Sequence, residues 1–362
     1  MKFHHLLMLL ALFAGIHSAP AQSNNLNIAA AGNQVILFWS VLDTNYVLLS
    51  TTNLDSPNWV QVCNAVPVTA VTVTNLPTTI FFRLVATTAG MAFVCGGQFT
   101  MGDTLDGEPD AIPISVTVTG FYMETNLVSY SLWQSVYNWA TNNGYGFDTN
   151  GMGKASNHPV QYVDWYDAVK WCNARSQLAG LTPVYYTDIE LTQVYEGFDD
   201  LDAVYANWSA NGYRLPTEAE WEKAARGGVS GQRFPWGNSI SESQANYYGD
   251  TTLGYDFGPN GYNAAFTNGA MPYTSPVGSF APNGYGLYDM AGNVLEWCWD
   301  WYGKPYGQPS TTNPTGPATG DNRVLRGGSW LHRANLATCA YRWSYNPYNW
   351  DDYAGFRCVR GF

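Results

Sequence analysis

Two patterns of hydrophobic and polar positions follow one another along the chain. Within residues 24–86, short apolar runs rich in β-branched and aromatic residues alternate with clusters of Asn, Asp, Pro and Thr. This alternation predicts a small module of short β-strands. The expected strands cover residues 34–41, 46–51, 59–63, 70–74 and 80–85. Because no ionisable residues cluster here, we expect a spacer or adhesion module without chemistry of its own, followed by a hinge at residues 87–90.

From residue 91 onward, Gly, Trp and Asn dominate and only three segments have helical periodicity. The expected N-terminal caps of these helices are Ser131, Asp164 and Thr217. The third signal is the sharpest, because Thr217 and Glu220 have the spacing of a capping box and Gly227-Gly228 can end the helix. The long remainder is expected to be loop-dominated and held by aromatic packing, disulfides or ions.

The first residues indicate export. Lys2 precedes an apolar run over residues 6–16, and Ala19-Pro20-Ala21 provides small residues of the kind that a signal peptidase reads. Residues 1–21 are therefore expected to be a cleaved signal peptide and the product to be secreted or periplasmic. No later apolar run approaches the ~18 residues of a membrane span, so no span is expected.

Composition narrows the classes of function. Charged residues make up 12% of the 362 residues and aromatics 15%, which is typical of a globular chain. The net charge of −12 argues against a nucleic-acid partner. Only His158 and His332 lie outside the signal segment, which disfavours multi-histidine metal centres and Ser-His-Asp triads. The even count of six cysteines favours disulfides in an exported chain.

Eight motifs in one order resemble the formylglycine-generating enzyme family, also called the sulfatase-modifying factor domain. They lie at residues 97–102 (GQFTMG), 158–160 (HPV), 212–222 (GYRLPTEAEWE), 234–237 (FPWG), 282–290 (PNGYGLYDM), 292–297 (GNVLEW), 326–330 (RGGSW) and 355–358 (GFRC). The resemblance covers residues 91–362 and leaves residues 22–88 as the β-sandwich-like module. It implies a loop-rich α+β domain with a variant of the C-type lectin fold and bound calcium.

The spacing of acidic residues gives some support to a calcium site, independently of the resemblance. Asp289 and Glu296 flank Gly292 and Val294, so two carboxylates and two carbonyls could converge on one hard cation. Solvated acids beside a turn are the other interpretation of this spacing, but the resemblance implies that these four positions are calcium ligands. It also implies a second calcium site. The residues that match it are Asn246, the carbonyl of Tyr247 and Asn268, which stands where an aspartate is usual.

The same resemblance brings a copper question. Enzymes of the family oxidise a substrate cysteine to formylglycine with oxygen and copper(I) held by two cysteines, and copper(I) prefers soft sulfur ligands. Counted from Ser329, the two cysteine positions fall on His332 and Ala337, and the next thiol is Cys339. We therefore expect no copper and assign no catalytic residue.

The resemblance also guides the cysteine pairing. Cys172 and Cys358 match a family disulfide, whereas the usual partner of Cys339 would stand at Ala225. The hypothesis is a Cys172–Cys358 bridge and a Cys298–Cys339 bridge. Cys63 and Cys95 are left as a third bridge or as two free thiols.

Two functions follow. The first is an exported, calcium-stabilised, non-catalytic protein whose C-terminal aromatic and Asn-rich surface binds a glycan, peptide or protein. Its candidate pocket residues are Ser329, Trp330, His332, Trp343, Tyr345 and Trp350. In the alternative interpretation of this surface, the same aromatics fill the core. The second function is a divergent formylglycine-generating oxidoreductase acting on a sulfatase cysteine. The neighbours Asp351 and Asp352 should point apart as exposed charges, which disfavours a glycosidase.

Overall fold

The computed structural model describes residues 27–31, 34–38, 46–51, 60–61, 70–73, 81–86, 89–201, 203–304, 306 and 310–361. The expected signal peptide and Cys63 lie outside these ranges. Among the described residues, no helix is long and apolar enough to cross a membrane.

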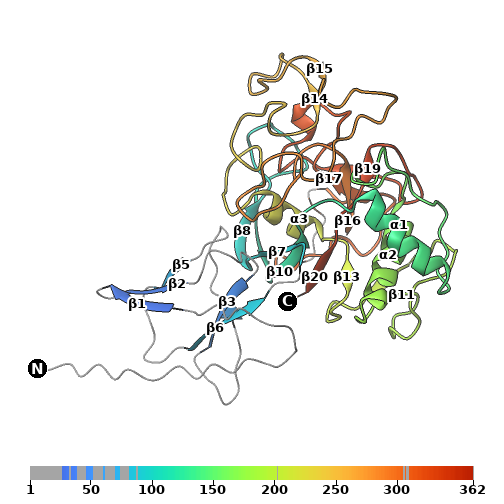
Figure 1. Ribbon diagram of the computed structural model, residues 1–362, viewed down its shortest axis with the longest axis horizontal. Coiled ribbons are helices and arrows are strands. Elements are labelled where there is room, and N and C mark those ends of the chain that lie inside the picture. The colour runs from blue at the N-terminus through green and yellow to red at the C-terminus, as the bar shows by residue number, and fades with distance from the viewer. Residues whose placement is uncertain are drawn as a thin grey trace, which may run out of the picture.

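The described N-terminal strands form two three-stranded antiparallel sheets, drawn in blue and cyan in Figure 1. One sheet has the order β1-β2-β5, with bounds Asn27–Ala31, Gln34–Phe38 and Ala70–Val73. The other has the order β4-β3-β6, with bounds Val60–Gln61, Tyr46–Thr51 and Phe81–Ala86. All five predicted strands are confirmed in position. The first strand was missed because its alanines lack the β-branched signal.

Two four-stranded sheets organise the rest of the chain (Figure 1). The first has the order β13-β20-β10-β7, with bounds Tyr213–Arg214, Val359–Gly361, Phe121–Glu124 and Met91–Val94. The second has the order β18-β17-β16-β19, with bounds Trp343–Tyr345, Arg323–Arg326, Leu295–Trp301 and Ala354–Gly355. Both sheets recruit C-terminal strands, so the end of the chain closes the domain.

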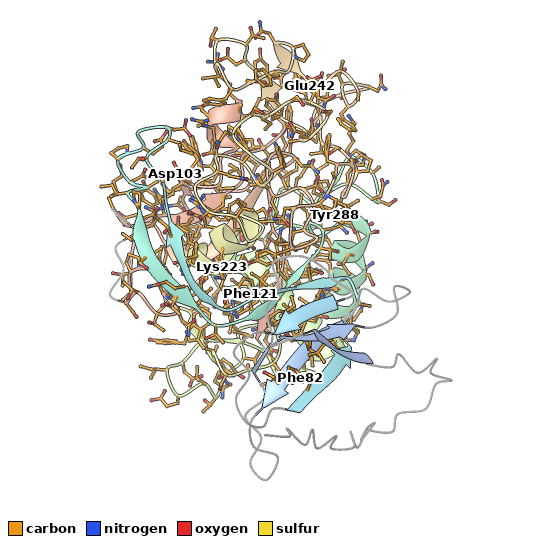
Figure 2. The ribbon with its side chains drawn as sticks, turned by 90° about the vertical axis from the view of Figure 1, so that its left-hand side faces the viewer. Phe82, Asp103, Phe121, Lys223, Glu242 and Tyr288 are labelled. Carbon is orange, nitrogen blue, oxygen red and sulfur yellow. The ribbon has the colours of Figure 1, made fainter. Side chains whose placement is uncertain are left out.

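Three strand pairs accompany these sheets. Strands β8 and β9 cover Gly97–Met101 and Ile114–Val118, β11 and β12 cover Tyr185–Tyr186 and Tyr205–Ala206, and β14 and β15 cover Tyr248–Gly249 and Gly261–Tyr262. Figure 2 shows Lys223 beside the β8–β9 hairpin, where its Nζ donates to the carbonyl of Gly97 at 3.0 Å.

The three predicted helices are present, with one corrected cap. Helices α1, α2 and α3 cover Tyr130–Thr141, Trp165–Leu178 and Glu218–Ala225, and a 3₁₀ turn covers Ala334–Leu336. Asp164 and the Thr217–Glu220 capping box are confirmed. The cap of α1 is Ser129 rather than Ser131, because Ser129 is extended and its Oγ accepts from Leu132 N at 3.3 Å. The backbone N–H of Ser131 instead donates to the carbonyl of Ser156 at 2.9 Å.

Aromatic packing forms much of the core. Trp133 of α1 stacks on Trp171 of α2 with ring centroids 5.7 Å apart, and Phe356 packs edge-on against both. Large buried rings replace long regular elements here, because each buries 150–250 Å² of surface. The expectation of a loop-rich α+β fold held by aromatics is confirmed.

Helix α3 is surrounded by buried ion pairs. All eight of its residues are buried. Glu222 accepts from Arg226 Nη2 at 2.7 Å and from Arg326 Nη2 at 2.6 Å, and Glu218 accepts from Arg342 Nε at 2.5 Å. These bonds tie the helix to β17 and to the chain that follows it.

Candidate functional site

Gly327 and Gly328 turn the chain sharply after β17 and so position two of the candidate pocket residues, Ser329 and His332. Their φ angles are +92° and +69°, in the left-handed region that favours glycine. A Cβ on Gly328 would lie 2.9 Å from the Cα of Ala337, so only glycine allows the chain to fold back here. The turn brings Ser329 and His332 beside β18.

The imidazole of His332 is held on several sides. Its Nδ1 lies 2.8 Å from Ser329 Oγ, and its ring centroid lies 5.7 Å from that of Trp343 and 5.4 Å from that of Tyr353. Burial lowers the pKa of His332 to about 4, so the imidazole is neutral at physiological pH. Ser329 is fully buried and is therefore a poorly accessible nucleophile. The contact with Ser329 therefore fixes the imidazole beside β18.

Asp351 anchors the aromatic side of this region. Its Oδ2 accepts from Tyr345 Oη at 2.6 Å and from Tyr353 Oη at 2.8 Å. The expectation of exposed charge at Asp351 and Asp352 is corrected, because both are half-buried and burial raises the pKa of Asp352. Sequence reasoning missed Tyr353, since nothing local marks it as a neighbour of His332.

The candidate pocket residues divide into a buried and an exposed group. Trp330 is 2% exposed and its Nε1 donates to the carbonyl of Asp352 at 3.1 Å, so it belongs to the core. Trp350 is 49% exposed and Tyr348 47%. Between these extremes, Trp343 and Tyr345 are half-buried. We call Trp343, Tyr345, Tyr348 and Trp350 the C-terminal aromatic surface.

The exposed rings of this surface are supported from below. Trp350 packs on Tyr162 with ring centroids 5.7 Å apart, and Tyr348 packs on Tyr166 at 5.0 Å. The Nε1 of Trp343 is buried and forms no hydrogen bond within the described residues.

The two positions that the resemblance gives to copper ligands do not fit copper(I). One is the neutral His332 and the other is Ala337, which is 1% exposed and carries only a methyl group. Burial raises the pKa of the nearest following thiol, Cys339, to about 12, so it is protonated. A protonated buried thiol is a poor ligand for a soft metal.

Asp289 provides a donor that fits calcium. The residue is 7% exposed with φ +55°, and its Oδ2 accepts from Gly278 N at 2.7 Å. Its Oδ1 is buried and has no hydrogen-bond partner among the described residues. Burial raises the pKa of Asp289 to about 6, and Gly278 N, Arg357 and the Asn293 side chain oppose this shift only in part. An unpartnered buried carboxylate oxygen suits a hard cation.

Glu296, the other acidic residue of the expected calcium loop, already has a protein partner. Arg357 donates its Nε to Glu296 Oε2 at 2.6 Å and its Nη2 to Oε1 at 2.9 Å, and both side chains are fully buried. Each carboxylate oxygen has a second lone pair, so calcium and Arg357 can share Glu296. The nearby Gly292 has φ +79°, and a Cβ there would lie 2.3 Å from the carbonyl oxygen of Asn246.

The second expected calcium site finds less support. Asn246 is buried and donates its Nδ2 to the carbonyl of Tyr273 at 2.8 Å, whereas Asn268 is exposed. Tyr247 is fully buried and donates its hydroxyl to Asp256. Asp256 is a buried acid that sequence reasoning missed, and Gly258 N and Asp250 N also donate to it. Protein hydroxyl and N–H groups therefore already bind both carboxylate oxygens of Asp256.

The cysteine pairing remains a prediction, because Cys172, Cys298, Cys339 and Cys358 are not bridged in the structure. Cys172 and Cys358 are fully buried with their Sγ atoms 3.6 Å apart, which fits the expected bridge on oxidation. Cys298 and Cys339 are buried in one hydrophobic cluster. Cys95 is buried as well.

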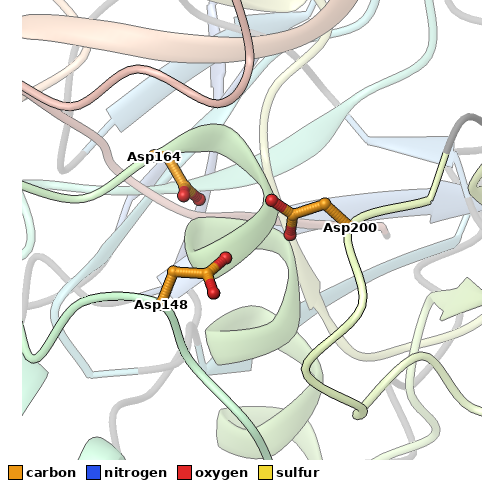
Figure 3. Close-up of side chains that lie close together, drawn as sticks. All are labelled: Asp148, Asp164 and Asp200. Atoms are coloured by element: carbon orange, nitrogen blue, oxygen red, sulfur yellow. The ribbon is translucent and has the colours of Figure 1, made fainter.

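Three carboxylates that no motif marked meet at the start of α2 (Figure 3). Asp148, Asp164 and Asp200 place oxygens within 4.8 Å of one another, and we call them the acidic cluster. Lys170 lies beside them, with Nζ 3.6 Å from Asp200 Oδ1 and 3.3 Å from Asp167 Oδ1. Burial and the Asp167 carboxylate raise the pKa of Asp164 to about 8. Burial also raises the pKa of Asp200 to about 7, with Lys170 opposing the shift and Asp148 adding to it. We interpret the cluster as a structural group that shares protons.

Replacing Asp200 with asparagine should make the protein less sensitive to alkaline pH. Asp164 and Asp200 have raised pKa values in the folded state, so their stabilising contribution is complete near pH 4 and is lost as pH rises toward 7 and 8. Asp200→Asn removes one titrating charge, and it also removes the repulsion by which Asp200 raises the pKa of Asp164. Chemical denaturation at pH 5 and pH 8 should show a smaller loss of unfolding free energy than in the wild type. The exposed Asp321→Asn is the matched control, and an equal slope in both variants would contradict the interpretation.

The fold and its glycine turns indicate a class of protein. The described residues form small sheets, three helices and long loops packed by aromatic side chains, and glycines with positive φ stand at several positions of the family motifs. A model of the sulfatase-modifying factor enzyme 1-like domain matches residues 78–362. The chain belongs to this family, and its fold is the loop-rich α+β fold of the formylglycine-generating enzyme type, a C-type-lectin-like fold.

Individual relatives differ in what their names imply. The chain is 32% identical over 298 residues to the chaperone protein LppX of Paenibacillus barcinonensis, covering 78% of this chain and 98% of that protein. It is 38% identical over 213 residues to the formylglycine-generating enzyme of Thermomonospora curvata, covering 56% of this chain and 55% of that enzyme. Among solved structures, Treponema denticola variable protein 1 is similar, with 28% identity, a TM-score of 0.61 and coverage of 75% of this chain and 95% of that chain.

Proposed function

We propose that this protein is an exported, non-catalytic member of the sulfatase-modifying factor family, stabilised by calcium, which binds a glycan or peptide ligand through its C-terminal aromatic surface. The observation that carries this proposal is the chemistry at the two cysteine positions of the family. A neutral imidazole and a buried methyl group stand there, at His332 and Ala337. Neither supplies the thiolate pair that copper(I) oxidation requires.

Ligand binding is proposed from two exposed aromatic rings that are held in place by other aromatic side chains. Trp350 and Tyr348 present large exposed rings. The Trp350 ring is packed on Tyr162 and the Tyr348 ring on Tyr166. Rings fixed in this way lose little conformational entropy on binding, which is the property of aromatic anchors in recognition surfaces.

Calcium would bind at Asp289, with the carbonyls of Gly292 and Val294 and the carboxylate of Glu296 as further ligands. The unpartnered Oδ1 of Asp289 supports this assignment. The ion would neutralise a buried charge and fix the loop that leads into β16. Export is proposed from the N-terminal sequence alone.

Restoring the two sulfurs provides the sharpest test of the non-catalytic assignment. The purified wild-type chain should show no sulfur-ligated copper(I), and it should not convert a sulfatase-type cysteine peptide to formylglycine when copper(I) and oxygen are supplied. His332→Cys/Ala337→Cys should gain copper(I) binding, measured by competition with a chromogenic chelator. Formylglycine in the wild-type reaction, detected by mass spectrometry, would establish the alternative oxidoreductase function instead.

The ligand surface is tested separately. On glycan and peptide arrays, Trp350→Ala should weaken binding of any captured ligand by about tenfold or more, as expected for a central aromatic anchor. Phe257→Ala is the matched control, because Phe257 is 73% exposed in a different loop. Equal binding by both variants would show that the C-terminal aromatic surface does not hold the ligand.

A further inference from the structure

A separate cavity of about 470 Å³ lies beside the β9–β10 turn, the start of α3 and the last strand, β20. Its volume is within the range of about 300–1,000 Å³ that is typical of small-molecule sites. Its polar lining includes Thr119, Ser209, Asn211, Thr217, Asn313 and Thr315. None of the residues of the C-terminal aromatic surface lines this cavity.

The charges in the cavity are already paired. Arg214 donates Nη1 to Glu220 Oε2 and Nη2 to Glu220 Oε1, both at 2.7 Å, in a bidentate pair that is largely buried. The first N–H groups of α3 are also used, because Thr217 N donates to Glu220 Oε2 at 2.9 Å and Glu218 N donates to Asp300 Oδ2 at 2.8 Å. An anion would therefore find the guanidinium and these N–H groups already engaged. The occupant should be uncharged.

The remaining polar groups are hydroxyls and amides, which both donate and accept. Several are fixed in advance. Asn313 accepts from Thr119 N at 2.7 Å and donates to Thr119 Oγ1 at 2.9 Å, and Asn211 accepts from Thr182 N at 2.9 Å. A rim held in this way reduces the entropic cost of binding.

Trp208 supplies the apolar wall of the cavity. Its ring is 43% exposed, yet it is fixed by an edge-to-face contact with Trp299 at 5.5 Å and by the Arg214 guanidinium, 5.2 Å from the ring centroid. An indole surrounded by hydroxyl and amide groups can bind a molecule that has an apolar C–H face and many hydroxyl groups.

We propose that this cavity binds one ring of a neutral sugar and that it is a ligand site distinct from the C-terminal aromatic surface. The ligand class is an uncharged pyranoside, free or as part of a glycan. The Trp208 ring packs on the C–H face, and the Thr, Ser and Asn groups bind the hydroxyls.

Saturation-transfer NMR with methyl glycosides of neutral hexoses and N-acetylhexosamines tests the proposal, with methyl glucuronide as an anionic comparison. At least one neutral glycoside should bind the full wild-type chain, and the glucuronide should bind more weakly. Trp208→Ala should weaken the binding by about tenfold or more, equivalent to about 1.4 kcal/mol. Thr315→Phe, which adds a ring to the cavity lining, should do the same, with thermal melting confirming that both variants fold.

Phe257→Ala is the matched control, since it removes an exposed aromatic ring that lies outside both the cavity lining and the C-terminal aromatic surface. It should leave glycoside binding unchanged, and Trp350→Ala distinguishes the two proposed sites. The proposal is overturned if no neutral glycoside binds, if binding survives in both Trp208→Ala and Thr315→Phe, or if only Trp350→Ala abolishes it. The last result would place the sugar on the C-terminal aromatic surface, so failure of this proposal and failure of the proposed function are distinguishable.

Discussion

Replacing Arg326 with methionine should lower the free energy of unfolding by about 3–5 kcal/mol, because a buried ion network would lose its central cation. The side chain is fully buried, and its Nη2 donates to Glu222 Oε2 at 2.6 Å and to the Cys339 carbonyl at 2.6 Å. Its Nη1 donates to the carbonyls of Ala340 at 3.0 Å and Tyr341 at 2.8 Å. Methionine fills similar space but leaves these buried acceptors without a donor. Chemical denaturation measures the loss.

Arg333 is the matched control for this substitution. It also pairs with a carboxylate, Asp250, at 3.1 Å, but its side chain is 63% exposed. Surface pairs contribute about 0–1 kcal/mol, so Arg333→Met should change stability little. If the two variants lost similar amounts, burial would not be what makes the network around α3 important.

Calcium should raise the unfolding free energy of the wild type by up to about 4 kcal/mol when the free ion exceeds its dissociation constant a thousandfold. Asp289→Asn should abolish this response, because the unpartnered oxygen of Asp289 would lose its charge. In chelator, the same variant should be at least as stable as the wild type, since it no longer buries an uncompensated carboxylate. Thermal unfolding with calcium and with chelator measures both effects.

The acidic cluster provides the control for this prediction. Asp200→Asn also removes one carboxylate from a group of closely spaced acids, of which only Asp164 is buried, but it should keep the full calcium response. A calcium response that persists in Asp289→Asn and disappears in Asp200→Asn would move the ion to the acidic cluster, and a wild type without any response would remove calcium from the proposed function.

Local signals in the chain predicted the elements that local physics determines. The Thr217–Glu220 capping box, the Asp164 cap and the N-terminal strands depend on neighbours a few residues apart, and they appear where expected. Ser129 rather than Ser131 caps α1, because the tertiary structure makes Ser129 the extended residue whose side chain accepts from Leu132 N. Two serines two residues apart offer the same local signal.

The sequence by itself determined which atoms are present: no thiol at His332 or Ala337, and an acidic pair at Asp289 and Glu296. Only the tertiary structure decided their surroundings. Burial makes His332 neutral, leaves one oxygen of Asp289 without a partner, and gives Glu296 to Arg357. The acidic cluster and the Trp208 cavity join segments far apart in the chain. Charge state and ligand access depend on burial and on contacts between such distant segments, which no local spacing specifies.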